Sequence, residues 1–389
     1  MGKNNLKTNN LYTIIIYILW IAIFKIFAIP SVVQKIQKTI CILIVIVYIT
    51  TNVKKKKYYF NKVGIMIIWM ILTCFISYIR EFISASNLFN GIMNALCIEL
   101  IYIMVCYGMD NNKKEEIINS LYHTLLIYVI CSLVSIWLKG SSNDVLLYYF
   151  AGNKFRTTYY IIMFDVFYAI KFDVPNKRKI RYLALIILTI IICYYVRCST
   201  TVVASLLLTM VYIKKEKARK ILSNKILIML IMFIATVVVF FITRLLGEKW
   251  ISYIIVNILG ENLSLTGRLD IYKSLFDISK KSPIFGFGYG NSEIAQIVGY
   301  GNAQNSMFQT IIETGYIGAI FFIIVFYQGI SNKSKKKVKN DLWPAYIYVY
   351  ITIICASIEV TFNYMFYSAL FYIYAIENQK SEKKESTKI

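Results

Sequence analysis

Residues 264–322 read SLTGRLDIYKSLFDISKKSPIFGFGYGNSEIAQIVGYGNAQNSMFQTIIETGYIGAIFF and contain the one long polar interruption in a nearly continuous series of apolar segments. Around this stretch, apolar runs recur that are close to the ~20 residues an α-helix needs to cross the hydrocarbon core of a membrane. We identify twelve runs, at residues 11–29, 36–51, 63–79, 88–107, 117–138, 157–172, 181–196, 198–213, 226–246, 305–330, 342–358 and 361–377.

The composition excludes a soluble globular protein, because 58% of the residues are hydrophobic and the mean hydropathy is +0.60. Backbone groups in lipid must be paired within a helix or a closed barrel. Barrel strands would alternate apolar and polar residues, and these runs do not alternate. The sequence therefore predicts an all-α integral membrane protein with about twelve transmembrane helices and one large extracytoplasmic loop between the ninth and the tenth.

The distribution of charge predicts the orientation in the membrane. The net charge of +23 is concentrated in alternate loops, as at residues 54–57, 177–181, 214–225 and 333–339. Such loops face the cytoplasm by the positive-inside rule, which places both termini in the cytoplasm of a multi-pass protein of the cell membrane. Topology and membrane-surface charge explain these runs, so no nucleic-acid partner is expected.

The same reasoning divides the chain into four parts. Residues 1–246 form an N-terminal transmembrane bundle of about nine helices, and residues 305–377 form the C-terminal transmembrane helices. Residues 378–389 are a cytoplasmic tail. Residues 247–304 form the outer loop, which carries five acidic and five basic residues. We expect an amphipathic helix in it from Gly267 to before Pro283, with its apolar face made by Leu265, Leu269, Tyr272 and Phe276.

This region resembles the C-terminal signature of the O-antigen ligase and polymerase superfamily. In that family a Gly-Arg opens a short helix and a Pro-x-x-Gly-x-Gly turn follows. A His-Asn pair then starts a helix that carries Gln, Glu and Gly-x-x-Gly. Here the corresponding residues are Gly267, Arg268, Pro283 to Gly290, Gln304, Asn305, Gln309, Glu313, Gly315 and Gly318. The family histidine is replaced by Gln304.

The resemblance implies a membrane glycosyltransferase that works on polyprenyl-diphosphate-linked oligosaccharides at the outer face of the cytoplasmic membrane. An acceptor hydroxyl attacks the anomeric carbon and polyprenyl diphosphate leaves. Because ligases rely more heavily on the histidine, its absence favours a polymerase of capsule, O-antigen or similar repeat units. The expected partners are this lipid-linked substrate, the bilayer and other polysaccharide export proteins. We expect no cofactor and no metal.

The candidate catalytic residues lie in the matching motif. The resemblance assigns diphosphate binding to Arg268, and its guanidinium can make two parallel hydrogen bonds to a phosphate. Gln304 can orient a hydroxyl, and Glu313 or Asp270 can accept a proton. Asn305, Gln309 and Glu313 are spaced by four, so they share one helix face. Hydrogen bonds between helices are the structural alternative for this polar stripe. Either Asn305 or Ser306 can cap the helix, and Ser306 with Gln309 has the spacing of a capping box.

The candidate binding residues surround the outer loop. Arg156, Arg197 and Arg244 all lie at outer ends of predicted spans, where they can meet a diphosphate. Ser199 and Thr201 match a Ser-Arg-Thr stretch that opens a span in the family. Tyr289 can stack on a sugar ring, and packing against the bundle is its alternative. Gln309 completes the predicted binding set.

Two other polar residues are excluded from the predicted chemistry. Lys25 is expected to extend its ammonium group from the outer end of its span to the interface. His123, the only histidine of the chain, lies near the cytoplasmic start of the fifth span and so cannot serve a reaction outside.

Three other functions fit parts of the sequence. A ligase would transfer the glycan from the lipid to another acceptor. A flippase or another transporter would also have about twelve spans, but no repeat is visible and the ninth-to-tenth loop is long. A structural membrane partner would leave the polar face from Asn305 to Glu313 without a purpose.

Overall fold

The computed structural model describes residues 2–27, 29–53, 58–59, 61–141, 148–172, 174, 179–222, 224–246, 248, 250, 253, 256–257, 268–291, 298–299, 301–330, 338 and 342–386. Within these ranges the side chains of residues 2–10, 179, 242–246, 268–269 and 378–386 are not described.

The described part of the chain folds into α-helices, and its only β-pairing is an isolated bridge between Tyr149 and Gly152. The helices are α1 (Gly2–Ile23), α2 (Ser31–Asn52), α3 (Lys62–Ile79), α4 (Ala85–Asp110), α5 (Lys114–Lys139), α6 (Lys154–Lys171), α7 (Lys179–Tyr195), α8 (Ser199–Ile213), α9 (Lys215–Leu222), α10 (Lys225–Leu246), α12 (Arg268–Lys281), α14 (Ser306–Gly329), α15 (Trp343–Cys355) and α16 (Tyr364–Ser386).

Each of the twelve predicted apolar runs coincides with a helix, which confirms the all-helical membrane class. Five helices are long and apolar enough to cross a membrane, namely α2, α3, α4, α5 and α14. The bent pair of α9 and α10 is a sixth candidate, and the apolar parts of α1, α7, α8 and α15 are shorter. That all twelve helices cross the membrane, with the loop after α10 outside, stays a prediction.

The centre of the bundle is formed by helices that are apolar on all sides. Helix α15 buries nearly its whole length, and it packs against α16, α6, α8 and α10. Helix α2 lies at the periphery and exposes a row of large apolar residues that includes Val32, Ile36, Ile40 and Leu43. An exposed apolar stripe of this kind suits contact with lipid.

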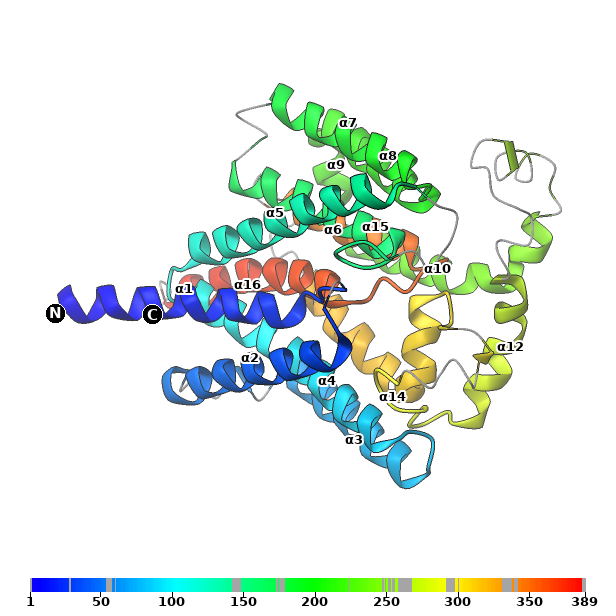
Figure 1. The fold of residues 1–389 in the computed structure, drawn as a ribbon, viewed down its shortest axis with the longest axis horizontal. Helices are drawn as coiled ribbons and strands as arrows, with labels where there is room; N and C mark the ends of the chain where they lie inside the picture. Colours follow the sequence, from blue (N-terminus) through cyan, green and yellow to red (C-terminus); the bar gives the residue numbers. More distant parts are fainter. Residues whose placement is uncertain are drawn as a thin grey trace.

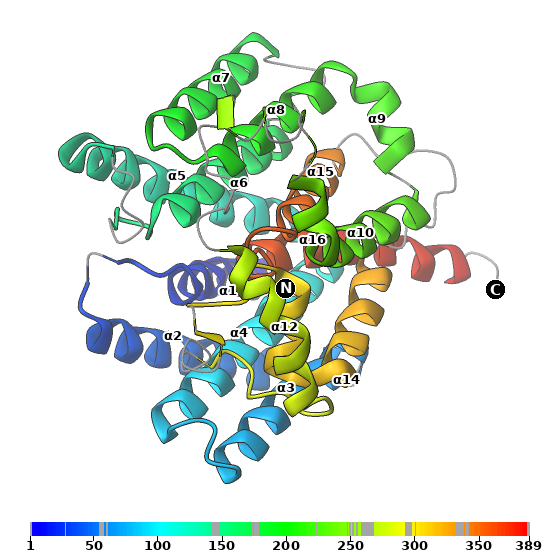
Figure 2. The same cartoon turned by 90° about the vertical axis from the view of Figure 1, so that its right-hand side faces the viewer.

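The two termini lie at one end of the bundle, and α12 lies at the other (Figure 1). In the view along the bundle, α16 and α15 lie in the middle, with α10 and α12 on the side of the viewer (Figure 2). Helix α12, which belongs to the long segment between α10 and α14, therefore lies at the end of the bundle opposite the termini.

Helix α12 is amphipathic as predicted, with Tyr272 on its buried face, but Phe276 does not belong to that face. Leu265 and the Leu269 side chain, also predicted there, lie outside the described residues. Its buried apolar residues are Ile271, Tyr272, Leu275 and Ile278, whereas Phe276 is 44% exposed. The buried set follows the i, i+4, i+7 pattern of a single helix face. The Tyr272 hydroxyl donates to the carbonyls of Gln304 (3.1 Å) and Ser357 (3.2 Å). Helix α12 thereby anchors the chain just before α14 and the α15–α16 connection.

Candidate functional site

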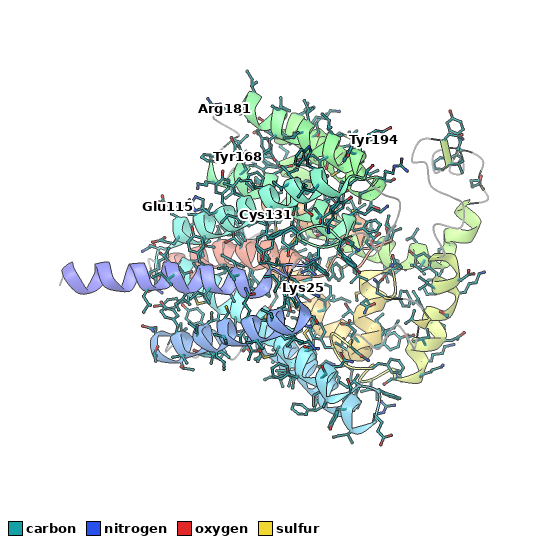
Figure 3. The ribbon with its side chains drawn as sticks, viewed as in Figure 1. Lys25, Glu115, Cys131, Tyr168, Arg181 and Tyr194 are labelled. Carbon is teal, nitrogen blue, oxygen red and sulfur yellow. The ribbon has the colours of Figure 1, made fainter. Side chains whose placement is uncertain are left out.

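A cavity of about 2320 Å³ lies at the end of the bundle opposite the termini. It is lined by the last residues of α1 and α7 and by the first residues of α2, α4, α6, α8, α14 and α16. Lys25, which lines it, follows the end of α1 that is remote from the N-terminus (Figure 3). The cavity is larger than the pockets of about 300–1,000 Å³ that hold most small ligands.

One wall of the cavity is built by a turn that is inserted into a break in α14. Helix α14 is non-helical at Gly315, so the usual bond from the Tyr316 N–H to the Ile312 carbonyl is replaced. The Phe287 N–H donates to the Ile312 carbonyl (2.8 Å), and the Tyr316 N–H donates to the Pro283 carbonyl (2.7 Å). Both groups freed by the break are thereby satisfied by the turn from 283 to 290, as buried backbone groups require.

Glycine is required at two points where the 283–290 turn contacts α14, a contact that we call the joint. Gly315 has a φ of +71°, and a Cβ there would lie 2.0 Å from the Ile284 carbonyl oxygen. Gly286 has a φ of +66°, and a Cβ there would lie 2.5 Å from the Ile312 carbonyl oxygen. The glycines of the family motif therefore let two backbones touch at the site. Phe287 packs inward against Phe82, whereas Tyr289 lines the cavity.

Asn305 is a helix cap in this structure. Its side-chain oxygen accepts from the N–H groups of Met307 (3.1 Å) and Phe308 (3.0 Å). Its amide donates to the carbonyls of Ala235 (3.1 Å) and Ser357 (3.5 Å), and the residue is fully buried. Asn305 is not among the residues that line the cavity. The geometry therefore assigns it to holding α10, α14 and the α15–α16 connection together.

The alternative cap, Ser306, has a different role from the one its spacing suggested. Its hydroxyl donates to the Glu359 carbonyl (2.9 Å) and accepts from the Thr361 N–H (2.7 Å). Gln309 accepts instead from the Ala303 N–H (2.8 Å). The capping box is therefore replaced by an Asn305 cap and by a contact that fixes the α15–α16 connection.

Glu313 faces the cavity and is held by two neighbours. The Gln309 amide donates to Glu313 Oε1 (2.7 Å), and the Gly290 backbone hydrogen-bonds the same carboxyl group. Because the other end of Gln309 is fixed by Ala303, the carboxyl group has a defined orientation. Gln309 and Glu313 thus form the part of the predicted polar stripe that reaches the cavity.

Gln304 lines the same cavity and has an unusual backbone. Its φ is +49°, in the left-handed region that residues other than glycine seldom adopt. The Asn302 side chain accepts from its N–H (2.8 Å), and Tyr272 donates to its carbonyl. Both backbone groups are thereby occupied within the protein. The residue in the slot of the family histidine thus shares one cavity with Glu313.

Two of the predicted arginines line the cavity. Arg156 lies in the first turn of α6, with its guanidinium carbon 5.3 Å from the centre of the Phe27 ring. Arg197 lies between α7 and α8 with a φ of +55°, and Lys154 donates to its carbonyl (3.1 Å). Arg197, Arg156 and Gln304 therefore converge on one space although they are far apart in the sequence.

Sequence reasoning missed four further cations of this cavity, Lys25, Lys35, Lys38 and Lys154. Lys25 was interpreted as a residue that merely reaches the interface. The sequence contained a signal for two of them, because basic residues are depleted on the outer side of a membrane protein and any that occur there need a reason. Lys35 and Lys38 at the predicted outer end of a span are exceptions to that rule.

Besides Asn305, three predicted residues do not add to the described cavity. The side chains of Arg244 and Arg268 lie outside the described residues, so their roles stay predictions. Asp270 is exposed and pairs with Lys273 (3.1 Å), and it does not line the cavity. His123 lies toward the other end of the bundle, where it hydrogen-bonds Tyr17 (2.8 Å) and Lys171 (3.0 Å).

Tyr289 and the neighbouring tyrosines give the cavity an aromatic wall. Burial raises the pKa of the Tyr289 phenol well above its usual range, so its hydroxyl stays protonated at neutral pH. Tyr364 and Tyr367 also line the cavity and lie within electrostatic reach of it. Aromatic faces next to amides and cations suit a ligand with sugar rings and an anionic group.

Comparison with known proteins identifies the segment that builds much of this site. Residues 182–323 match the family model described as O-Antigen ligase. The match confirms the resemblance to the O-antigen ligase and polymerase superfamily, and it supports a membrane enzyme of the ligase or polymerase type. It includes Arg197, Gln304 and Glu313, whereas Arg156 and the cavity lysines lie before it. No curated protein and no solved structure matches the chain.

Proposed function

We propose that this protein is a polysaccharide polymerase that joins polyprenyl-diphosphate-linked oligosaccharide repeat units at the outer face of the cytoplasmic membrane. The observation that carries the proposal is the placement of an oriented carboxyl group, Glu313, in one large cavity with arginines and lysines. A glycosyl transfer from a diphosphate needs both a proton acceptor and cations for the leaving group.

The proposed step is a displacement at the anomeric carbon of the donor. A hydroxyl oxygen of the acceptor glycan forms the new bond to that carbon. The bond from the carbon to the diphosphate oxygen breaks, and the electron pair leaves with polyprenyl diphosphate. The hydroxyl proton passes to Glu313. Arg197 and Arg268 stabilise the charge that develops on the diphosphate.

Glu313 is the better of the two predicted proton acceptors. It faces the cavity and its orientation is fixed by Gln309, whereas Asp270 is exposed and paired with a lysine. Gln304 cannot take a proton usefully, but its amide can orient the acceptor hydroxyl. We therefore assign proton transfer to Glu313 and orientation to Gln304.

The size of the cavity supports a polymer-forming role. A volume of about 2320 Å³ leaves room for sugar residues of an acceptor as well as those of the donor. The replacement of the family histidine by Gln304 favours a polymerase over a ligase. Metal independence, and partnership with other export proteins, belong to the same proposal.

The test is an analysis of lipid-linked glycans in cells that carry Glu313→Gln. We expect polymer synthesis to fall by about 10²–10⁴-fold, the range of general base catalysis, and single repeat units to accumulate on the lipid at the outer face. Glu313→Asp should restore part of the polymer. Asp277→Asn, which removes an exposed carboxyl group of α12, is the matched control and should leave the chain length unchanged.

Two outcomes would refute the assignment. Polymer of normal length from Glu313→Gln, at normal protein level in the membrane fraction, would remove Glu313 from the chemistry. Accumulation of single units at the cytoplasmic face in cells that lack the protein would indicate a flippase instead.

A further inference from the structure

The charges that line the cavity are out of balance. Among the described residues that line it, the basic side chains are Lys25, Lys35, Lys38, Lys154, Arg156 and Arg197, and the acidic ones are Glu313 and Glu359. A diphosphate diester carries about two negative charges at neutral pH. The cavity therefore holds more positive charge than the leaving group requires.

Four of these cations form a group that we call the N-terminal cation cluster: Lys25, Lys35, Lys38 and Arg156. Lys25 lies within electrostatic reach of the other three, and Lys38 lies within reach of Arg156. The members come from the α1–α2 connection, the first turns of α2 and the first turn of α6. Packing thus brings together like charges from separate elements.

The described partners of this cluster are neutral. Lys38 donates to the Asn94 side-chain oxygen (2.6 Å) and to the Tyr364 hydroxyl (3.1 Å), and Lys35 donates to the Ser86 hydroxyl (3.2 Å). None of the ion pairs found in the described part of the chain includes a member of the cluster. Like charges held together beside a membrane without a counter-charge are costly, so the arrangement suits an anionic ligand.

The cluster also lies before the segment that matches the O-antigen ligase family. Arg197, Arg244 and Arg268 lie inside that segment, so it contains cations enough for the diphosphate that the proposed reaction requires. The additional cations belong to the part of the chain outside the match. This division suggests that they recognise a feature of the particular glycan.

The cluster is connected to the wall that carries Glu313. Tyr364 and Lys38 both donate to Asn94, and the Asn94 amide lies beside Gly290, 2.9 Å from where a Cβ on that glycine would be. Gly290 in turn hydrogen-bonds Glu313. A glycan whose reacting end lies at Glu313 can therefore extend along this wall to the lysines.

We propose that the N-terminal cation cluster binds an anionic substituent of the glycan, a carboxylate or a phosphate, so that the natural repeat unit of this enzyme is acidic. The inference rests on the proposed polymerase function and adds the class of its substrate. Lys38, fixed by Asn94 and Tyr364, makes the central contact, and Lys35 and Arg156 flank it.

The first test is the composition of the lipid-linked repeat unit, isolated from cells that lack this protein and determined by mass spectrometry. We expect at least one carboxylate or phosphate on the sugars, in addition to the diphosphate of the carrier. A repeat unit composed only of neutral sugars would overturn the inference.

The second test combines enzyme and substrate changes. The acidic group of the isolated unit is converted into a neutral one, as a carboxyl into a primary alcohol, with the intact diphosphate verified by mass. Polymerisation of both units is measured with full-length wild-type protein and with Lys38→Met, which keeps the length of the side chain. For wild-type protein we expect the neutral unit to lower kcat/KM by about 10–100-fold, as for a lost charge-assisted hydrogen bond. With Lys38→Met, the kcat/KM values for the two units should differ little.

The control variants separate this site from the diphosphate site and from folding. Arg197→Ala should slow the polymerisation of both units by the same factor, because both units keep the diphosphate. Lys35→Met should reproduce Lys38→Met in part, and Lys280→Met on the surface of α12 should behave as wild type. Equal rates for the two units with wild-type protein, or equal slowing of both by Lys38→Met, would refute the anionic-glycan site. Failure of wild-type protein to polymerise the native unit would refute the proposed function instead.

Discussion

At the scale of single residues, two side chains of the site are held on a strained backbone. Gln304 and Arg197 have φ values of +49° and +55°, and both line the cavity. A residue other than glycine in this region costs about 1–3 kcal/mol and is retained where the surrounding structure enforces it. The strain supports a functional use of both positions. The sequence predicted Gln304 as a site member through the family motif and Arg197 through its place at the outer end of a span, but neither pattern predicted the backbone conformation of these residues.

The polar stripe from Asn305 to Glu313 was predicted in part. Gln309 and Glu313 share a helix face as their spacing required. Asn305 departs from that face because a cap residue has non-helical dihedral angles, here −150° and 124°. Its side chain turns back to the first N–H groups of α14 and is buried. Residues spaced by four therefore share a helix face only when all of them lie inside the helix.

A rescue experiment tests the shared location of Gln304 and Glu313. Glu313→Gln removes the proposed base, and Gln304→His in the same chain restores the residue type of the family motif. We expect the double variant to recover part of the activity that Glu313→Gln lacks. A histidine accepts a proton only when neutral, so the recovered rate should fall as the pH drops below about 6.5. The measurement is polymer formed against pH. A double variant as inactive as Glu313→Gln at pH 8 would contradict a common site.

At the scale of elements, the joint between the 283–290 turn and α14 positions the site. The sequence predicted the turn and the helix, but it did not predict the break at Gly315. Such a break is stable only because the turn supplies the two lost hydrogen bonds from about thirty residues earlier. A local pattern cannot contain that information. The turn also carries Tyr289 and Gly290 to the cavity.

Two alanine variants separate backbone strain from the close contact at this joint. Gly315 and Gly140 both have a φ of +71°, but only Gly315 would place a Cβ against another backbone, while Gly140 faces open space. Gly140→Ala should cost about 1–3 kcal/mol from the backbone conformation alone, because a φ of +71° with a ψ of −173° is a combination that almost only glycine adopts. Gly315→Ala should cost more and should also abolish polymer synthesis, because the turn must move. Thermal unfolding of the purified protein in detergent measures the first effect. Equal losses of stability for the two variants would contradict the close backbone contact that we assign to Gly315.

At the scale of the whole molecule, the sequence predicted which segments are helices but not what they enclose. Helix positions follow from run length and apolar composition, and all twelve runs are helical. The cavity, in contrast, combines Lys25, Lys35 and Lys38 from the start of the chain with Glu359 from the last connection. Their proximity results from packing between α1, α2, α4, α14 and α16, which no local pattern contains.

The structure also makes the orientation in the membrane testable. The cavity and α12 lie at the end opposite the termini, and α9 carries a basic segment. We expect Lys273→Cys on α12 to react with an impermeant thiol reagent in intact cells, and Lys217→Cys on α9 to react only after the membrane is opened. The eight native cysteines are buried or half-buried, so the parent protein should give a low background. Labelling of position 217 alone in intact cells would reverse the orientation.

The most direct measurement is polymer synthesis by the purified full-length protein in liposomes, with the isolated lipid-linked repeat unit as its only substrate. We expect a ladder of glycans that differ by one repeat unit, with one polyprenyl diphosphate released for each new linkage. Glu313→Gln in the same liposomes should release almost none. Transport of unpolymerised units across the liposome membrane by the wild-type protein, with no diphosphate carrier released, would contradict the polymerase and identify a transporter.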